Sequence, residues 1–168
     1  MITPNWSYFY TRVNIKASPQ EIMDMFLFPK KLESWFLSEA DFFPSENLTY
    51  ARKKSEKIQT GDTYEWRWHG YERSVVEKGL ILEIEEPNVL RFIFNKDNQV
   101  TIKIIPYKDQ QILELKQENI LTDEQSKMKF YVGCSNGWMY YFNNLKSIME
   151  GGIDLRNKDV DLQSILIS

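Results

Sequence analysis

The chain has 168 residues, of which 42% are hydrophobic and 27% are charged, with 7 Gly and 6 Pro. These values are typical of one globular domain, and they exclude a disordered, collagen-like or low-complexity chain. The formal net charge of −3 argues against nucleic acid as the main partner, because phosphate binding needs a strongly basic surface.

The chain contains one cysteine, Cys134, and one histidine, His69. It can therefore form neither an intramolecular disulfide nor a Cys/His zinc cluster. The N-terminal residues lack the cationic and apolar stretches of a signal peptide, and no apolar run reaches the roughly 18–20 residues of a membrane span. We expect a soluble cytoplasmic protein with no membrane insertion, no metal and no cofactor.

The N-terminal part of the chain predicts a strand followed by two short helices. Residues 7–16 are β-branched and aromatic without helical spacing, as in a strand. Ser18, Pro19 and Glu21 then form a helix start, with an N-cap, a first-turn proline and a capping box. Pro29 ends this helix and allows a second short one over residues 31–35.

From residue 64 onward, apolar side chains alternate with polar ones, which is the period of a half-buried strand. Turn-like breaks at residues 87–88, 95–98 and 108–110 favour antiparallel neighbours. The sequence therefore predicts an antiparallel sheet with one apolar and one charged face. The apolar face is assigned to Tyr64, Trp66, Trp68, Leu80, Leu82, Ile84, Leu90, Phe92, Phe94, Val100, Ile102, Ile104, Leu113 and Leu115.

The last third of the chain predicts one long helix that covers this face. Residues 122–125 fit a capping box, and a helix over residues 125–150 would be about 39 Å long. The Gly pair at 151–152 ends it, while Gly133 and Gly137 weaken its first turns. Its apolar stripe consists of Cys134, Trp138, Tyr141, Leu145 and Ile148, flanked by Phe142 and Met149.

No sequence motif of a phosphate-binding loop or a nucleophile elbow occurs. We interpret His69 as a partly exposed histidine at a strand end, with a general base as the alternative. Cys134 is interpreted as a buried structural thiol, since no adjacent cation would activate it. Glu83 and Glu85 fall on the charged face, so the alternation supplies no ionisable side chain to the interior. We predict no catalytic residue.

The aromatic side chains, 14% of the chain, allow either a filled core or a cavity between sheet and helix. Apolar walls with a few polar groups are how small-molecule sites are usually built. We expect the helix to form the lid, Tyr64 to supply a polar group, and Trp35 and Phe36 to lie near the entrance. The predicted walls are Trp66, Trp68, Leu82, Phe92, Phe94, Ile102, Leu113 and Leu115 on the sheet and Trp138, Tyr141, Phe142 and Leu145 on the helix.

Five segments resemble one known family in the order in which they occur. They are ASPQEI at 17–22, ESWF at 33–36, GDTYEWRW at 61–68, GLILEI at 79–84, and GW…L…I…GGIDLR over 137–156. The chain resembles the START-like (SRPBCC) superfamily, in the branch named for its likeness to the activator of heat-shock protein 90 ATPase.

The resemblance implies an α+β helix-grip fold. In this fold a curved antiparallel sheet of about six to seven strands wraps around a long C-terminal helix, and two short helices follow the first strand. We expect one such domain over residues 1–156 and a peripheral tail over residues 157–168.

For function, the resemblance implies a bacterial protein that binds a small hydrophobic ligand, such as a lipid, sterol or polyketide, between sheet and helix. The alternative is a co-chaperone-like or stress-response module that binds a chaperone or another protein. A cavity enzyme is a third interpretation. One His and one Cys exclude the Rieske and iron sites of some relatives, and the resemblance supplies no catalytic residue.

Overall fold

The computed structural model describes residues 5–46, 48–159 and 161–162. Within these residues, seven antiparallel strands form one sheet in the order β1-β7-β6-β5-β4-β3-β2. The strands are β1 (Tyr8–Ile15), β2 (Glu39–Phe43), β3 (Thr63–Arg67), β4 (Glu77–Glu85), β5 (Val89–Phe94), β6 (Asn98–Tyr107) and β7 (Gln110–Glu118). The helices are α1 (Pro19–Leu27), α2 (Pro29–Trp35), α3 (Glu124–Ser126), the π-helical segment η1 (Lys127–Gly133) and α4 (Cys134–Met149). The α+β helix-grip prediction is confirmed.

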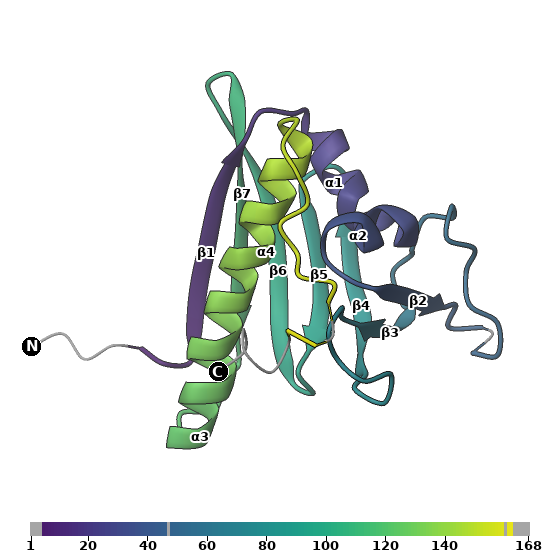
Figure 1. Ribbon diagram of the computed structural model, residues 1–168, viewed down its shortest axis with the longest axis vertical. Helices are drawn as coiled ribbons and strands as arrows, with labels where there is room; N and C mark the ends of the chain where they lie inside the picture. Colours follow the sequence, from purple (N-terminus) through teal and green to yellow (C-terminus); the bar gives the residue numbers. More distant parts are fainter. Residues whose placement is uncertain (1–4, 47, 160, 163–168) are drawn as a thin grey trace, which may run out of the picture.

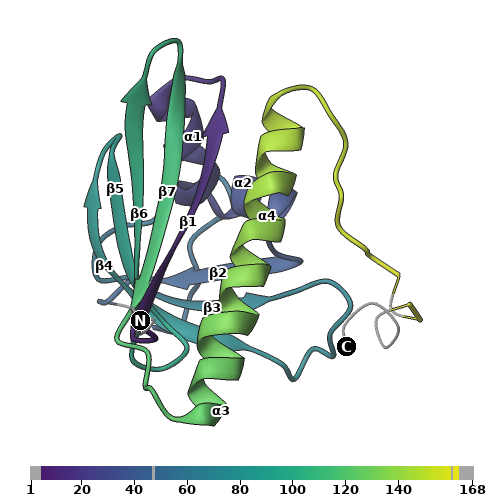
Figure 2. The same ribbon diagram turned by 90° about the vertical axis from the view of Figure 1, so that its left-hand side faces the viewer.

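Three helices share the apolar face of the sheet. Figure 1 shows α4 running across β1, β7 and β6, with α1 and α2 beside it toward β4 and β5. Ring contacts join these helices: Phe142 of α4 lies 6.4 Å from Phe26 of α1 and 6.5 Å from Trp35 of α2 between ring centres. Figure 2 shows α2 close to α4 on this side of the sheet. Sheet and helices therefore enclose a single core.

Helix α1 begins as the sequence predicts. Ser18 Oγ accepts a hydrogen bond from the Glu21 backbone N–H at 3.2 Å, and Glu21 Oε2 accepts one from the Ser18 backbone N–H at 2.8 Å. This reciprocal capping box satisfies two donors that a bare helix end would leave open. Pro29 does more than end α1, because it is also the first residue of α2, where its fixed φ favours helix initiation.

Strand β4 departs from the predicted alternation because it contains a β-bulge. The pairing with β5 shifts between Ile81 and Glu83, so residues before the bulge have the opposite parity to those after it. Ile81 is 1% exposed and takes the core position, whereas Leu80 is 37% exposed. Leu82 lies at the bulge and outside the core cluster. The assignment of Leu80 to the apolar face is therefore wrong.

Gly79, two residues before Ile81, allows close packing of an aromatic ring. A Cβ at this position would overlap both the Tyr64 ring and the Ile93 carbonyl oxygen, and the Tyr64 hydroxyl donates to that same oxygen at 2.5 Å. Neither the ring nor the carbonyl oxygen can move aside easily, because one is buried in the core and the other belongs to the backbone. The glycine therefore lets Tyr64, which is 1% exposed, lie flat against β4.

We expect Gly79→Ala to lower the free energy of unfolding by about 1–3 kcal/mol, as overpacking does in closed cores. Gly137→Ala is the matched control, because a Cβ there meets nothing within 4 Å. In a helix interior this second change should stabilise by about 0.5–1 kcal/mol. Urea unfolding of both variants checks the prediction, and equal effects of the two changes would contradict it.

The C-terminal helix is continuous but not uniform. Its N-cap is Asp123, whose Oδ1 accepts from the Ser126 backbone N–H at 3.0 Å, so the helix begins one residue later than the capping box predicted at residues 122–125. Seven residues of π-helix then precede α4. The predicted stripe faces the core: Trp138 and Leu145 are buried, while Cys134, Tyr141 and Ile148 are partly buried and pack against the core. Phe142 and Asn144 complete the buried face of α4.

The chain after α4 returns to the body of the protein. Arg156 is the anchor: its guanidinium donates to the carbonyl oxygens of Glu33, Ser34 and Leu37 at 2.8–3.0 Å, at the C-terminal end of α2. Arg156, at the end of the expected domain, therefore packs against the body of the protein. Residues 160 and 163–168 of the expected tail lie outside the described residues.

Candidate functional site

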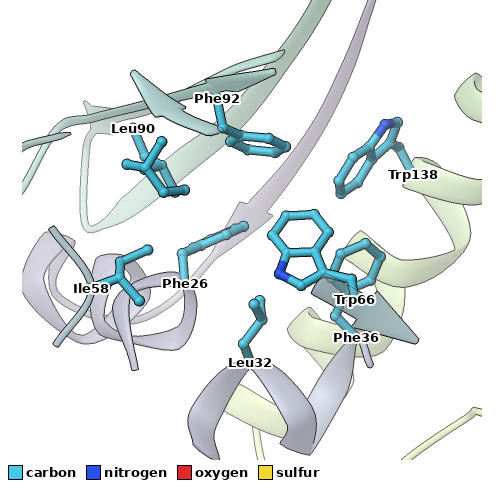
Figure 3. Close-up of a pocket in the computed structure, with 9 residues that line it drawn as sticks. Phe26, Leu32, Phe36, Ile58, Trp66, Leu90, Phe92 and Trp138 are labelled. Carbon is cyan, nitrogen blue, oxygen red and sulfur yellow. The ribbon is translucent and has the colours of Figure 1, made fainter. Parts of the chain in front are cut away.

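The centre of the molecule, between the sheet and α4, is filled. The space that remains there has a volume of about 10 Å³, which is at the lower limit for one water molecule. Figure 3 shows how closely apolar side chains surround it. They are Phe26, Leu32, Phe36, Ile58, Trp66, Ile81, Leu90, Phe92 and Trp138. A ligand therefore has no room in this centre.

Seven of the side chains predicted to bind a ligand belong to this closed core. They are Trp35, Tyr64, Ile102, Leu113, Leu115, Phe142 and Leu145, each 0–1% exposed. Trp66 and Phe92 line only the small central space, and Leu82 is displaced by the bulge in β4. None of these ten side chains lines the pocket of about 390 Å³ that opens beside the centre.

A pocket of about 390 Å³ opens beside the centre, at the end of the fold where η1 joins α4. It receives side chains from the end of α2, the segment between β3 and β4, the adjoining ends of β4 and β5, and the η1–α4 helix. Its lining consists of Phe36, Trp68, Tyr71, Val75, Glu77, Phe94, Asn95, Lys129, Gly133, Cys134, Gly137, Trp138 and Tyr141. Phe36, Trp68, Phe94, Trp138 and Tyr141 were predicted from the sequence.

Two other hollows lie on the surface, with volumes of about 320 and 530 Å³. The first is lined by charged side chains that already pair with one another, such as Arg67 with Glu39. The second covers the outward-facing pair Glu65 and Lys78 of β3 and β4, which lie 2.7 Å apart. Because these charges are mutually satisfied, neither hollow offers the free polar groups of a binding site.

The aromatic wall of the pocket is a connected set of rings. Phe36 stacks on Trp138 with ring centres 5.1 Å apart and planes at 28°, and Tyr141 meets Phe36 edge-on at 4.8 Å. Trp68 also meets Phe36 edge-on, at 5.8 Å. Phe36 and Trp138 line the central space as well as the pocket. The stacked pair is therefore the partition between the two.

Trp138 is held in place by a buried hydrogen-bond chain. Its indole Nε1–H donates to Gln117 Oε1 at 3.0 Å, and Gln117 Nε2 donates to Asn98 Oδ1 at 2.9 Å. Gln117 is 0% exposed, so this chain is shielded from water and orients the indole firmly. The wall that Trp138 presents to the pocket is therefore rigid.

The polar wall of the pocket centres on Glu77 and Asn95. Glu77 Oε1 accepts from the Asn95 backbone N–H at 2.6 Å, and Asn95 Nδ2 donates to the Cys134 sulfur at 3.1 Å. Burial raises the pKa of Glu77, while the Asn95 hydrogen bond and the charge of Lys129 act in the opposite direction. Burial also raises the pKa of the Cys134 thiol, which makes it a weak nucleophile at neutral pH.

Glu77 corrects the prediction that no ionisable side chain faces the interior. It pairs with Trp66 across β3 and β4 and shares its parity with Gly79 and Ile81 on the inner face. The signal was present in the sequence, since a period of two counted back from Ile81 places Glu77 inward. Alternation counted back from Leu82 instead places Glu77 on the outer face, because it does not allow for the bulge.

His69 and Cys134 differ in their relation to this pocket. His69 is partly exposed, as predicted, and is not among the lining residues; burial and the charges of Arg156 and Lys158 lower its pKa. Cys134 is a free thiol that lines the pocket and is only partly buried. Among the described residues, no group of three His, Cys, Asp or Glu side chains is placed to hold a metal ion.

The arrangement of these elements defines a class of protein. An antiparallel sheet that grips a long C-terminal helix, preceded by two short helices, is the helix-grip fold of START-like proteins. None of the helices in the described part of the chain is long and apolar enough to span a membrane.

The chain belongs to the family described as Activator of Hsp90 ATPase homolog 1-like protein, whose model matches residues 16–150. No curated protein matches the chain. Protein SSP2350 from Staphylococcus saprophyticus has a similar structure, with 19% identity over 89% of this chain and 96% of that one and a TM-score of 0.69.

Two further solved structures share the fold. The Aha1 dimer from Colwellia psychrerythraea is 15% identical over 86% of this chain and 97% of that one, with a TM-score of 0.66. CalU16 from Micromonospora echinospora is 18% identical over 94% of this chain and 81% of that one, with a TM-score of 0.62. At these identities the likeness establishes the fold.

Proposed function

We propose that the protein binds a small, mainly apolar ligand in the pocket where η1 joins α4. The observation that carries this proposal is the pocket itself, whose volume of about 390 Å³ falls within the roughly 300–1,000 Å³ of typical ligand sites. Aromatic rings line most of it, and a few polar groups, led by Glu77 and Asn95, line the rest. The START-like fold of the family is compatible with this function.

Binding would come mainly from burial of the ligand against the aromatic rings, at about 25 cal/mol per Å² of apolar surface before the costs of association. Because the Gln117 chain holds Trp138 in place, this wall needs little rearrangement on binding. Pre-organisation of that kind lowers the entropic cost of association.

The test is an amide NMR titration with fatty acids, sterols, flavonoid-like aromatics and 2-naphthylmethanol. Shifts concentrated on Asn95, Gly133 and Gly137, with core amides such as Ile102 unchanged, are the expected result. A folded spectrum that stays unchanged across the whole panel would overturn the proposal.

A pocket-filling variant sharpens this test. A side chain at Gly137 has open space within 4 Å, so Gly137→Met would project into the pocket without disturbing the core. We expect at least about tenfold weaker binding, or about 1.4 kcal/mol, with unfolding stability equal to or above that of the wild type, since methionine is the better helix former. Unchanged affinity would contradict the assignment of the binding site to this pocket.

A further inference from the structure

The inner face of β4 carries a carboxylate at a place where the rest of the sheet is apolar. Glu77 lies opposite Trp66, which is 3% exposed, and on the same face as Ile81, which is 1% exposed. A carboxylate taken out of water is unfavourable unless its charge is compensated. Such a group in a pocket is a candidate for function.

Glu77 supports the turn between β5 and β6, but only one of its two carboxylate oxygens takes part. Oε1 accepts from the N–H of Asn95, whose φ of +49° begins that turn. A neutral glutamine at this position would accept the same hydrogen bond. Within the described part of the chain, Oε2 has no hydrogen-bond partner and no cation lies within ion-pair distance. The turn therefore explains the acceptor at position 77 but not its charge.

The charge of Lys129 favours the ionised form of Glu77, but the two side chains form no ion pair among the described residues. Lys129 is exposed at the rim of the pocket, and its Nζ lies 5.2 Å from the centre of the Phe130 ring. Glu77 is the one carboxylate among the described lining residues. The half-buried charge inside the pocket is therefore negative, and the positive charge at the rim is solvated.

Six aromatic side chains line the same pocket, and the faces of such rings attract cations. A carboxylate facing aromatic rings favours a positively charged nitrogen on an apolar body, because the carboxylate forms a charge-assisted hydrogen bond while the rings cover the rest. A ligand carboxylate would instead meet Glu77 across a partly desolvated space, where like charges repel. The rings are Phe36, Trp68, Tyr71, Phe94, Trp138 and Tyr141.

We infer that the pocket is selective for aromatic amines in their protonated form, with the ammonium group at Oε2 of Glu77 and the aromatic body against Phe36, Trp68 and Trp138. This inference rests on the proposed function, since it assigns a ligand class to the same pocket. It gives Glu77 the role of a specificity-determining residue.

The experiment compares three ligands with one shared body: 2-naphthylmethylamine, 2-naphthylmethanol and 2-naphthoate. Isothermal titration calorimetry at pH 7 should give the order amine, alcohol, acid, with the amine bound at least about tenfold more tightly than the alcohol. Equal affinity for amine and alcohol would overturn the inference and leave the proposed function standing. No binding of any of the three, together with silence across the wider panel, would overturn both.

Glu77→Gln removes the negative charge but keeps the hydrogen bond, because the amide oxygen still accepts from the Asn95 backbone N–H. We expect this variant to bind the alcohol as the wild type does and to lose the preference for the amine. Glu83→Gln is the matched control, as it removes the same charge from the outer face, where Glu83 pairs with Arg91. The control should keep the preference. Loss of the preference in both variants would assign it to overall charge and contradict the inference.

A measurement on the wild type keeps the inference testable if Glu77→Gln fails to fold. The side-chain carboxyl carbon of Glu77, followed by ¹³C NMR, should shift on addition of 2-naphthylmethylamine and stay in place on addition of 2-naphthylmethanol. A carboxyl signal that ignores saturating amine would overturn the inference without any substitution.

Discussion

Phe142→Ala is expected to lower the free energy of unfolding by about 3–5 kcal/mol, the range for removal of a large aromatic side chain from a closed core. Phe142 is 0% exposed and contacts rings from α1 and α2, so its loss leaves a cavity between three helices. Urea unfolding measures the change. Affinity for 2-naphthylmethanol, measured on the folded variant, should change little, because Phe142 does not line the pocket.

The neighbouring residue provides the control. Tyr141 lies one position earlier on α4, is partly buried and lines the pocket. Tyr141→Ala should therefore cause the smaller loss of stability and the larger loss of affinity. The reverse ranking would mean that ligands enter the centre of the fold, as the sequence predicts for Phe142, and would contradict the assignment of the pocket.

Arg156→Ala should lower the free energy of unfolding by about 3 kcal/mol. The Arg156 side chain is 4% exposed, and it satisfies three carbonyl oxygens around the C-terminal end of α2. Its removal leaves these acceptors without their donor and Asp154 without its main ion-pair partner. Lys158→Ala, which removes an exposed partner of the same Asp154, should change stability by less than about 1 kcal/mol. Similar losses in both variants would contradict an anchoring role for Arg156.

The effect of Arg156→Ala should depend on pH. Hydrogen bonds from Arg156 hold the pKa of Asp154 far below its usual value. A carboxyl group whose pKa is lower in the folded state stabilises the fold above its unfolded pKa of about 3.9, and this contribution is lost as pH falls through the folded pKa. The stability difference between wild type and variant should therefore be full at pH 7 and shrink below about pH 4. A difference that is constant from pH 7 to pH 2 would show that Asp154 contributes nothing.

The fold could be predicted because its signals are local. The Ser18 capping box, the two-residue alternation of β3 and β5 and the helical spacing up to Leu145 each depend on neighbours in the sequence, and each occurs in the structure. The pocket depends on non-local events. The bulge after Ile81 turns Glu77 inward, and the wall at Phe36 depends on how α2 meets Trp138.

The size of the space between sheet and helix could not be predicted for a related reason. Apolar periodicity identifies the side chains that leave water, but it does not show whether opposite walls touch. Leu113, Leu115 and Ile102 were correctly placed on the inner face, and there they pack against the helices without a gap. Whether such a face lines a cavity depends on the distance between α4 and the sheet, which no residue spacing reports.

The π-helical segment Lys127–Gly133 is a place where the sequence can lose one residue without a shift in the register of α4. A π-helical turn accommodates one residue more than an α-helical turn, so loss of one residue here would leave a regular α-helix and preserve the register of α4 on the sheet. The helical residues on both sides of the deletion would keep their faces, because the deletion removes only the extra residue that the wide turn holds. A single deletion in this stretch would thus reshape the helix at the pocket, where Lys129 and Gly133 lie, while the core stays intact.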